Sequence, residues 1–267
     1  MQRAVPQLYN AMRFSLFIKA FSVAMVLLLN CAAGRAQSAD DLMAMGDVFD
    51  LRFQPGEALK DYLPAEKLEP NNVRLLVRIA RQYRHLMTDA TKREEKLRLG
   101  KIALEYGQRA AALAPNDSEA QLSPAITYGK MLPLQGTKEQ VDVSPRIKEA
   151  ADKAIKLDPR NDVAWHVLGR WHETLAGVGI IKRTLGEFIY GKLPVTTYKA
   201  AVSCFDKAIE INPHRLRHYI ELGRTYAHMG QYTDARRFIT KGLAMPNVEK
   251  DDPEMKIRGR EALAMLP

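Results

Sequence analysis

The chain has 267 residues, 46% of them hydrophobic and 27% charged, and it carries a net charge of +9. A chain of this length and composition can bury a large core, as one elongated domain or at most two compact ones. Proline and glycine do not gather in tracts, which excludes a low-complexity protein.

The stretch 1–36 has the composition of a targeting segment. It contains no Asp or Glu, and its apolar run AFSVAMVLLLNCAA is shorter than the roughly 20 residues that cross a membrane. Gly34 and Ala36 place small side chains where a signal peptidase cleaves. We therefore predict a signal peptide over 1–36, a mature domain over 37–267, and an exported, periplasmic protein. The basic residues of the segment are Arg3, Arg13, Lys19 and Arg35.

Two other interpretations of this segment stay open. The letters LLNC end at Cys31 as in a lipoprotein signal, although the bulky Asn30 stands where a small residue is usual. An acylated Cys31 would make the chain an envelope-assembly lipoprotein. An acid-poor N-terminus with arginines is also typical of a mitochondrial presequence or a membrane anchor. If residues 1–36 are removed, Cys204 remains alone and cannot form an internal disulfide.

Beyond this segment the sequence repeats itself. Each of five similar words combines a small residue, an apolar residue and a proline, and most continue with a polar residue that can cap a helix. Because proline ends one helix and the polar residue starts the next, each word predicts a boundary between helices. The words are AEKLEPNN, AAALAPND, AIKLDPRN, AIEINPHR and GLAMPNVE, with Pro70, Pro115, Pro159, Pro213 and Pro246.

The letters between these words fit the tetratricopeptide pattern of 34 residues. Small residues at fixed positions allow two helices to approach closely, and large residues fill the spaces between them. We predict an all-α tetratricopeptide-repeat superhelical solenoid of about five helical hairpins, ending in a C-terminal capping helix within DDPEMKIRGREALAML. Representative matches are Leu42, Gly46, Tyr62, Ala65, Leu168, Gly169, Phe205, Ala208, Tyr219, Leu222 and Gly223.

Three of the four intervals between the prolines exceed the 34-residue period. The excess falls between the two helices of a unit, near 88–98, 133–143 and 176–197. Within the third insertion, Ile181, Leu185, Phe188 and Ile189 lie on one helical face and predict a short helix near 180–190. We expect this helix to pack on the solenoid and on Trp171; the alternative is contact of the stretch 178–190 with a membrane surface.

The fourth unit also resembles a known family. LGRW at 168–171, the basic and apolar insert IIKRTLGEFIYGKLP, and the following AVSCFDKAIEINPHRLRHYIELGRTYAHMG are similar to the regulator of microtubule dynamics family. The resemblance covers roughly residues 60–245. It implies a protein of the microtubule-associated or mitochondrial kind without an agreed catalytic activity. An exported bacterial homologue would not meet a microtubule.

Motifs of enzymes and cofactors are absent from the sequence. There is no P-loop, dinucleotide-binding glycine motif, HExxH or CxxC. His214 and His218 are four residues apart, but without a third ligand we interpret them as surface or capping residues. Cys204 and Trp165 fit core positions. We therefore predict a non-enzymatic scaffold without metal or cofactor.

The predicted concave face is rich in arginine. In this repeat, defined positions of each first helix line the groove, and position 9 is Arg in the second, fourth and fifth units. Because the arginine fork suits carboxylates, we predict binding of a protein or acidic peptide. Nucleic acid is disfavoured, since the aromatic residues fit core positions and cannot stack on bases. The predicted ligand-binding residues are Arg74, Arg81, Arg84, Arg170, Arg217 and Arg224.

Overall fold

The computed structural model describes residues 37–178 and 194–267, and over these ranges the chain is built from helices without strands. The predicted signal segment 1–36 and most of the insertion at 176–197, with its expected helix near 180–190, lie outside the described residues. The helices are α2 (Ala39–Leu51), α3 (Pro55–Leu68), α4 (Val73–Asp89), α5 (Arg93–Leu113), α6 (Ser118–Met131), the 3₁₀ turn η1 (Leu132–Leu134), α7 (Thr137–Leu157), α8 (Asp162–Ala176), α10 (Tyr198–Ile211), α11 (Leu216–His228), α12 (Tyr232–Ala244) and α13 (Asp252–Ala264).

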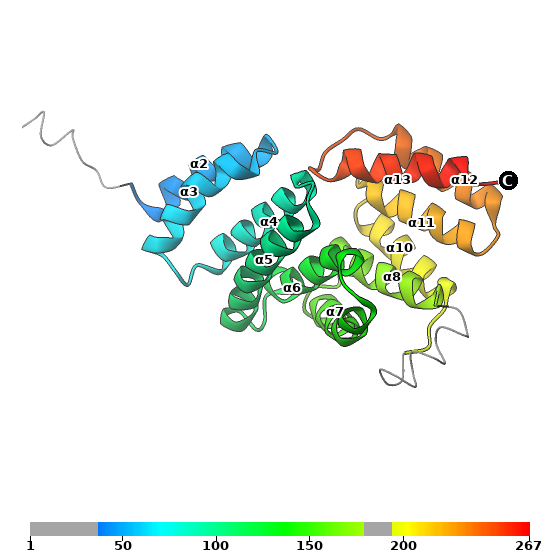
Figure 1. Ribbon diagram of the computed structural model, residues 1–267, viewed down its shortest axis with the longest axis horizontal. Coiled ribbons are helices and arrows are strands. Elements are labelled where there is room, and N and C mark those ends of the chain that lie inside the picture. Colours follow the sequence, from blue (N-terminus) through cyan, green and yellow to red (C-terminus); the bar gives the residue numbers. More distant parts are fainter. Residues whose placement is uncertain (1–36, 179–193) are drawn as a thin grey trace, which may run out of the picture.

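Consecutive helices pack as hairpins. The pairs are α2 with α3, α4 with α5, α6 with α7, α8 with α10, and α11 with α12, and α13 closes the stack against α11 and α12. Figure 1 shows these hairpins following one another along an arc. The structure thus confirms the predicted all-α solenoid of about five hairpins with a capping helix.

The helix boundaries have the local causes that the sequence indicated. Asn72, Asp117 and Asn161 are N-caps, and each side chain accepts a hydrogen bond from the backbone N–H three residues later. Ser38 forms a capping box with Asp41 at the start of α2. The prolines of the repeated words come just after the ends of the preceding helices, where they cannot continue the helix.

Small residues bring the two helices of a hairpin together. A Cβ atom on Gly169 of α8 would lie 2.8 Å from the Phe205 ring of α10, and one on Gly223 of α11 would lie 2.6 Å from Ile239 of α12. Phe205 and Ile239 are fully buried. The pattern of small and large residues therefore packs the hairpins as predicted.

The first two insertions form longer helices instead of long loops. Within 88–98 only Ala90–Lys92 lie outside a helix, and α5 has 21 residues. The second insertion begins with η1 and continues into α7, which also has 21 residues. These extra turns lengthen the second and third hairpins without interrupting the stack.

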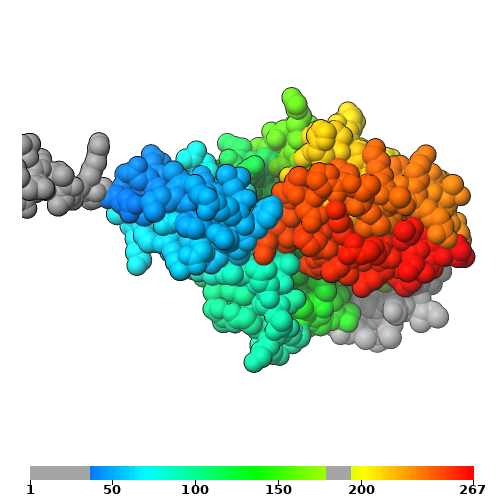
Figure 2. Space-filling model, turned by 90° about the horizontal axis from the view of Figure 1, so that it is seen from above, coloured from blue at the N-terminus to red at the C-terminus, as the bar shows by residue number. Residues whose placement is uncertain are grey.

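The arc of hairpins curves back on itself. The connector between α12 and α13, residues 245–251, reaches the end of α4, where the Thr88 hydroxyl donates a 2.8 Å hydrogen bond to Asp251 and Lys250 pairs with Asp89 at 2.8 Å. Figure 1 shows the start of α13 beside the end of α4, and Figure 2 shows the connector next to the first hairpin. The concave face is therefore bounded by the C-terminal part of the chain.

Candidate functional site

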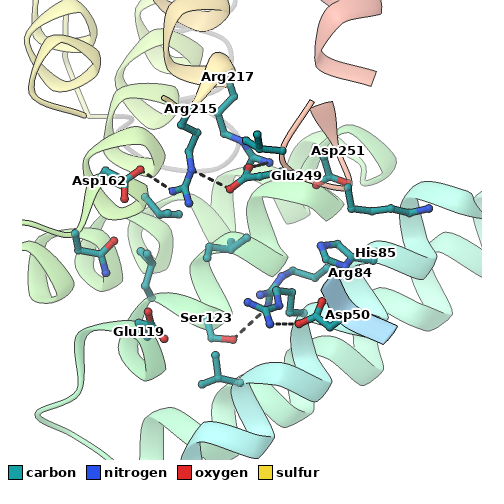
Figure 3. Close-up of a pocket in the computed structure, with 18 of the residues that line it drawn as sticks. Asp50, Arg84, His85, Glu119, Ser123, Asp162, Arg215, Arg217, Glu249 and Asp251 are labelled. Carbon is teal, nitrogen blue, oxygen red and sulfur yellow. Dashed lines mark hydrogen bonds and ion pairs between the residues drawn. The ribbon is translucent and has the colours of Figure 1, made fainter. Parts of the chain in front are cut away.

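The concave face contains a cavity of about 580 Å³ (Figure 3). The end of α2, the inner sides of α4 and α6, the N-terminal ends of α8 and α11, and the connector all contribute to its lining. The first helices of the second to fifth hairpins thus contribute to the lining, and α8 and α11 do so only at their N-terminal ends. Apolar side chains of the lining include Val77, Leu122, Ile126 and Val163.

Arg84 of α4 holds a buried charge at this cavity. The residue is 6% exposed, and one guanidinium nitrogen donates to the hydroxyls of Ser123 at 3.2 Å and Thr127 at 3.3 Å. Among the described residues no carboxylate lies within ion-pair distance of it. Burial lowers the pKa of Arg84 to about 10, aided by the Arg81 charge and opposed by Asp251. The side chain therefore stays charged at neutral pH, with hydrogen-bond donors that lack an anionic partner.

His85 lies beside Arg84 on the same lining. Its Nδ1 atom is buried and has no hydrogen-bond partner among the described residues. Burial lowers the pKa of His85 to about 3, against the attraction of Asp251, so the ring is neutral at physiological pH. In Figure 3 both side chains lie near Asp50 and Ser123 at one end of the cavity.

The connector lines the cavity with acids. Glu249 pairs with Arg215 at 2.9 Å and with Arg217 at 2.6 Å. Asp251 pairs with Lys130 of α6 at 2.8 Å. Burial alone would raise the pKa of Asp251, but Lys130, Arg217 and the Thr88 hydrogen bond together lower it to about 2. The Asp251 carboxylate is therefore ionised at neutral pH.

Three of the six predicted arginines line the cavity, namely Arg81, Arg84 and Arg217. Arg81 forms an ion pair with Asp50 of α2, and Arg217 forms the pair with Glu249. Arg74 is exposed at the start of α4 and does not contribute to the cavity. Position on the concave face therefore does not by itself give an arginine a free charge.

Arg170 and Arg224 lie outside the cavity lining, in a buried charge cluster between the fourth and fifth hairpins. Arg170 of α8 pairs with Glu173 and with Glu221 of α11, the second at 2.7 Å, and Arg224 also pairs with Glu221. Both glutamates are almost fully buried. These two arginines therefore neutralise internal acids, which the sequence analysis did not foresee.

The two glutamates of this cluster have opposite pKa shifts. Burial raises the pKa of Glu173 to about 7, and the neighbouring Glu221 charge adds to the effect of burial against Arg170. Burial acts on Glu221 in the same direction, but Arg170, Arg224 and Arg258 together outweigh it and lower its pKa. Glu221 is thus the ionised carboxylate that pairs with Arg170 and Arg224.

The histidines differ from their sequence interpretation. His214 is exposed, but His218 is fully buried and lies neither at the surface nor at a cap. Its Nε2 is 2.8 Å from Asp162 of α8, and its Nδ1 is 3.0 Å from His166 Nδ1. Burial lowers the pKa of both rings. These hydrogen bonds join the fourth hairpin to the fifth. The described residues hold no group of ligands suited to a metal ion.

Trp171 is buried, with 6% of its surface exposed, and its Nε1 donates to the backbone oxygen of Ser144 in α7 at 3.0 Å. The expected packing of the insertion on Trp171 stays a prediction. Any contact with 179–193 falls outside the described residues. Cys204 is buried as predicted, and burial raises the pKa of its thiol to about 11. Trp165 is partly buried against the same core.

Sequence reasoning missed the functional candidates that come from outside the repeat positions. Lys130 and Arg215 line the cavity, and so do the acids of the connector. The acidic letters VEKDDPE at 248–254 were a usable signal, since a run of acids next to a basic groove indicates pairing.

Together the hairpins and the lined concave face define a tetratricopeptide-repeat solenoid. A thermophilic tetratricopeptide protein of Thermus thermophilus has the same fold, with a TM-score of 0.62 and 17% identity over 85% of this chain and all of that one. The chain belongs to the regulator of microtubule dynamics protein 1-3 family, whose model matches residues 39–266.

Two relatives show the extent of this kinship. Regulator of microtubule dynamics protein 1 of Bos taurus is 26% identical over 96% of this chain and 80% of its own length. Protein 2 of Homo sapiens is 27% identical over 79% of this chain, which spans 51% of that relative. Within 37–178 and 194–267, no helix has the length and apolar character needed to cross a bilayer.

Proposed function

We propose that the protein is a binding scaffold whose concave cavity holds an acidic segment of a partner protein. The observation that carries this proposal is the Arg84 guanidinium, which is buried at the cavity without a carboxylate among the described residues. A buried charge without a counter-charge is costly, and an entering carboxylate would remove that cost.

The chemistry of the cavity favours a peptide with both acidic and apolar side chains. The guanidinium can donate two parallel hydrogen bonds to one carboxylate, a geometry that an ammonium group does not offer. His85 adds an unpaired ring nitrogen, and Arg217 adds a buried Nε without a hydrogen-bond partner among the described residues. The apolar lining of Val77, Ile126 and Val163 gives room for a neighbouring apolar side chain.

The other predicted arginines have different parts in this proposal. Arg81 and Arg217 assist at the cavity, because each has one acidic partner that a ligand can replace. Arg170 acts on the ligand only indirectly, by holding the fourth and fifth hairpins together through Glu221, and Arg224 pairs with the same glutamate within α11. Arg74 contributes a surface charge to the approach of an acidic partner.

We also propose that the scaffold has no catalytic activity and that it is exported after removal of 1–36. The family and the fold neighbour are consistent with a scaffold. The name of the relatives refers to microtubule dynamics, and an exported chain would use the same groove on another partner. Mass spectrometry of the mature N-terminus tests this: Gln37 as the first residue supports export, a lipid on Cys31 supports the lipoprotein alternative, and an intact N-terminus contradicts both.

The binding proposal is tested with a dye-labelled eight-residue peptide of alternating leucine and glutamate, followed by fluorescence anisotropy. We expect its affinity to fall with rising salt, and Arg84→Gln to weaken it about tenfold or more, since an unpaired carboxylate then enters a buried site. The matched control is Arg74→Gln, which removes the same charge from the exposed start of the same helix.

Three results would contradict the proposal. One is equal weakening by the two substitutions, which would make binding a matter of net charge. Another is equal affinity for a peptide with glutamine in place of glutamate. The third is an absence of binding to the wild-type protein at low salt.

A further inference from the structure

The connector between α12 and α13 has the chemistry of the ligand that we propose for the groove. It is a short acidic segment with one exposed apolar residue, Val248, followed by Glu249, Lys250 and Asp251. It lines the cavity with these four residues, and it pairs with the basic side chains of the groove. The connector therefore lies in the groove where an acidic peptide ligand would lie.

Its contacts span the groove from the fifth hairpin to the second. Glu249 is bound to Arg215 and Arg217 at the start of α11. Asp251 is bound to Lys130 of α6 and to Thr88 of α4. The cations held by the connector are therefore ones that a partner's carboxylates would use.

The connector is anchored to the start of α13. The Asp252 carboxylate accepts hydrogen bonds from the backbone N–H groups of Val248 and Glu249, each at 2.8 Å. Asp252 itself is buried, and Met255 holds α13 in the core with Ile220 and Leu216. The ion pairs of Lys250 with Asp89 of α4 and of Asp251 with Lys130 of α6 are separate from this anchor, so displacement requires them to break but leaves the packing of α13 intact.

Arg84 is a buried cation of the lining that has no ion pair with the connector. Burial lowers the pKa of the Arg84 guanidinium and the Asp251 charge opposes this, but Asp251 forms its ion pair with Lys130 and not with Arg84. A partner carboxylate would therefore meet Arg84 first and then compete with Asp251 for Lys130.

We propose, on the basis of the function proposed above, that the connector 245–251 is an internal acidic ligand of the groove and that the acidic segment of a partner displaces it. The groove then takes segments like its own connector, with an apolar residue followed by two acids spaced one residue apart. Binding is weakened by the connector and strengthened when the connector is released.

The test compares three variants with the wild type in the anisotropy assay with the leucine–glutamate peptide. Glu249→Gln with Asp251→Asn removes the acids that compete with the probe. Asp89→Asn removes the ion pair with Lys250 and loosens the connector without changing a carboxylate of the cavity. Glu254→Gln with Glu261→Gln is the matched control, because it makes the same charge change at exposed positions of α13.

We expect the double connector variant to bind the probe about fivefold more tightly or better, Asp89→Asn to show a smaller gain, and the α13 control to stay within about twofold of wild type. A synthetic peptide of residues 246–253 should compete with the probe for the double connector variant. The same peptide with Gln and Asn at positions 249 and 251 should not compete.

The outcomes separate this inference from the proposed function. If the wild type binds the probe but neither connector variant binds it more tightly than the α13 control, the connector is a fixed wall and the inference is overturned alone. If circular dichroism shows that the double connector variant is unfolded, the gain of Asp89→Asn decides, and the competing peptide is then tested on Asp89→Asn. If no protein binds the probe, both proposals fall.

Discussion

Arg84 of α4 and Arg170 of α8 both lie in first helices of hairpins, Arg84 buried and Arg170 partly buried with 32% of its side chain exposed. Arg84 has only hydroxyl groups as polar side-chain partners among the described residues, whereas Arg170 has two glutamates. The charge of Arg170 is used inside the protein to join two hairpins. The charge of Arg84 lies beside a cavity without a counter-charge. Such an arrangement is expected of a binding residue, whereas a structural arginine is paired as Arg170 is.

The largest expected effect is at the paired arginine. Arg170→Met should lower the free energy of unfolding by about 3 kcal/mol, because it leaves Glu173 and Glu221 buried with less positive charge. Urea unfolding followed by circular dichroism measures this. Arg74→Met, at an exposed position, should change stability by no more than about 0.5 kcal/mol. Equal losses in the two variants would show that the buried cluster does not support the fold.

The residue beside Arg170 tests the packing on which the cluster depends. Gly169→Leu should lower stability by about 1–3 kcal/mol, since its side chain would overlap the buried Phe205 ring. The control is Gly129→Leu in α6, where a Cβ would meet nothing within 4 Å. A thermal midpoint that falls equally in both variants would contradict the close approach of α8 and α10.

These regions also differ in how far the sequence could predict them. The hairpins could be predicted from local signals, because the repeat pattern itself specifies residues such as Gly169, Phe205 and Pro159 at fixed positions. The pairing of Arg170 with Glu221 joins residues 51 apart in sequence, and it exists only after two hairpins have stacked. A single chain shows the arginine and the glutamate without showing that they meet.

The lining of the cavity depends on contacts between residues still farther apart in sequence, so it was harder to predict. Asp251 reaches Lys130 across 121 residues, since the curvature of the whole solenoid returns the connector to α4 and α6. Curvature accumulates from the small rotation at each interface between units, which the repeat pattern does not specify. For this reason the sequence predicted a basic concave face but not which of its cations are already neutralised.

Glu173, one of the two acid partners of Arg170, should make the free energy of unfolding depend on pH. The pKa of Glu173 is raised to about 7 in the folded chain, above its ordinary value of 4.5. A raised carboxyl pKa stabilises the folded state below the unfolded pKa, and this contribution is lost as pH rises through the folded pKa. Between pH 5 and pH 8 the wild type should therefore lose on the order of 1–2 kcal/mol relative to Glu173→Gln.

Urea unfolding of the wild type and Glu173→Gln at pH 5, 6, 7 and 8 measures this difference. Subtracting the two curves removes the titration of His85 and of the other shared groups. Parallel curves would show that Glu173 ionises normally despite its burial, and the contribution of Arg170 would then belong to both glutamates equally.

The smallest change in stability, with the opposite sign, is expected at the unpaired arginine. Arg84→Met should leave the free energy of unfolding unchanged or raise it by up to about 1 kcal/mol, because it removes a buried charge that has no counter-charge. The apolar side chain can pack against Ile126 and Leu122 of the same lining. The Thr127 hydroxyl keeps its 3.1 Å hydrogen bond to the Ser123 backbone oxygen, so the substitution leaves few polar groups unsatisfied.

Urea unfolding of Arg84→Met beside Arg170→Met makes the comparison direct, since the same substitution is made at two arginines. A loss of more than about 1 kcal/mol at Arg84 would mean that its bonds to Ser123 and Thr127 outweigh the cost of burying its charge, as expected of a residue kept for stability. Unchanged stability together with lost peptide binding would instead assign this arginine to the ligand.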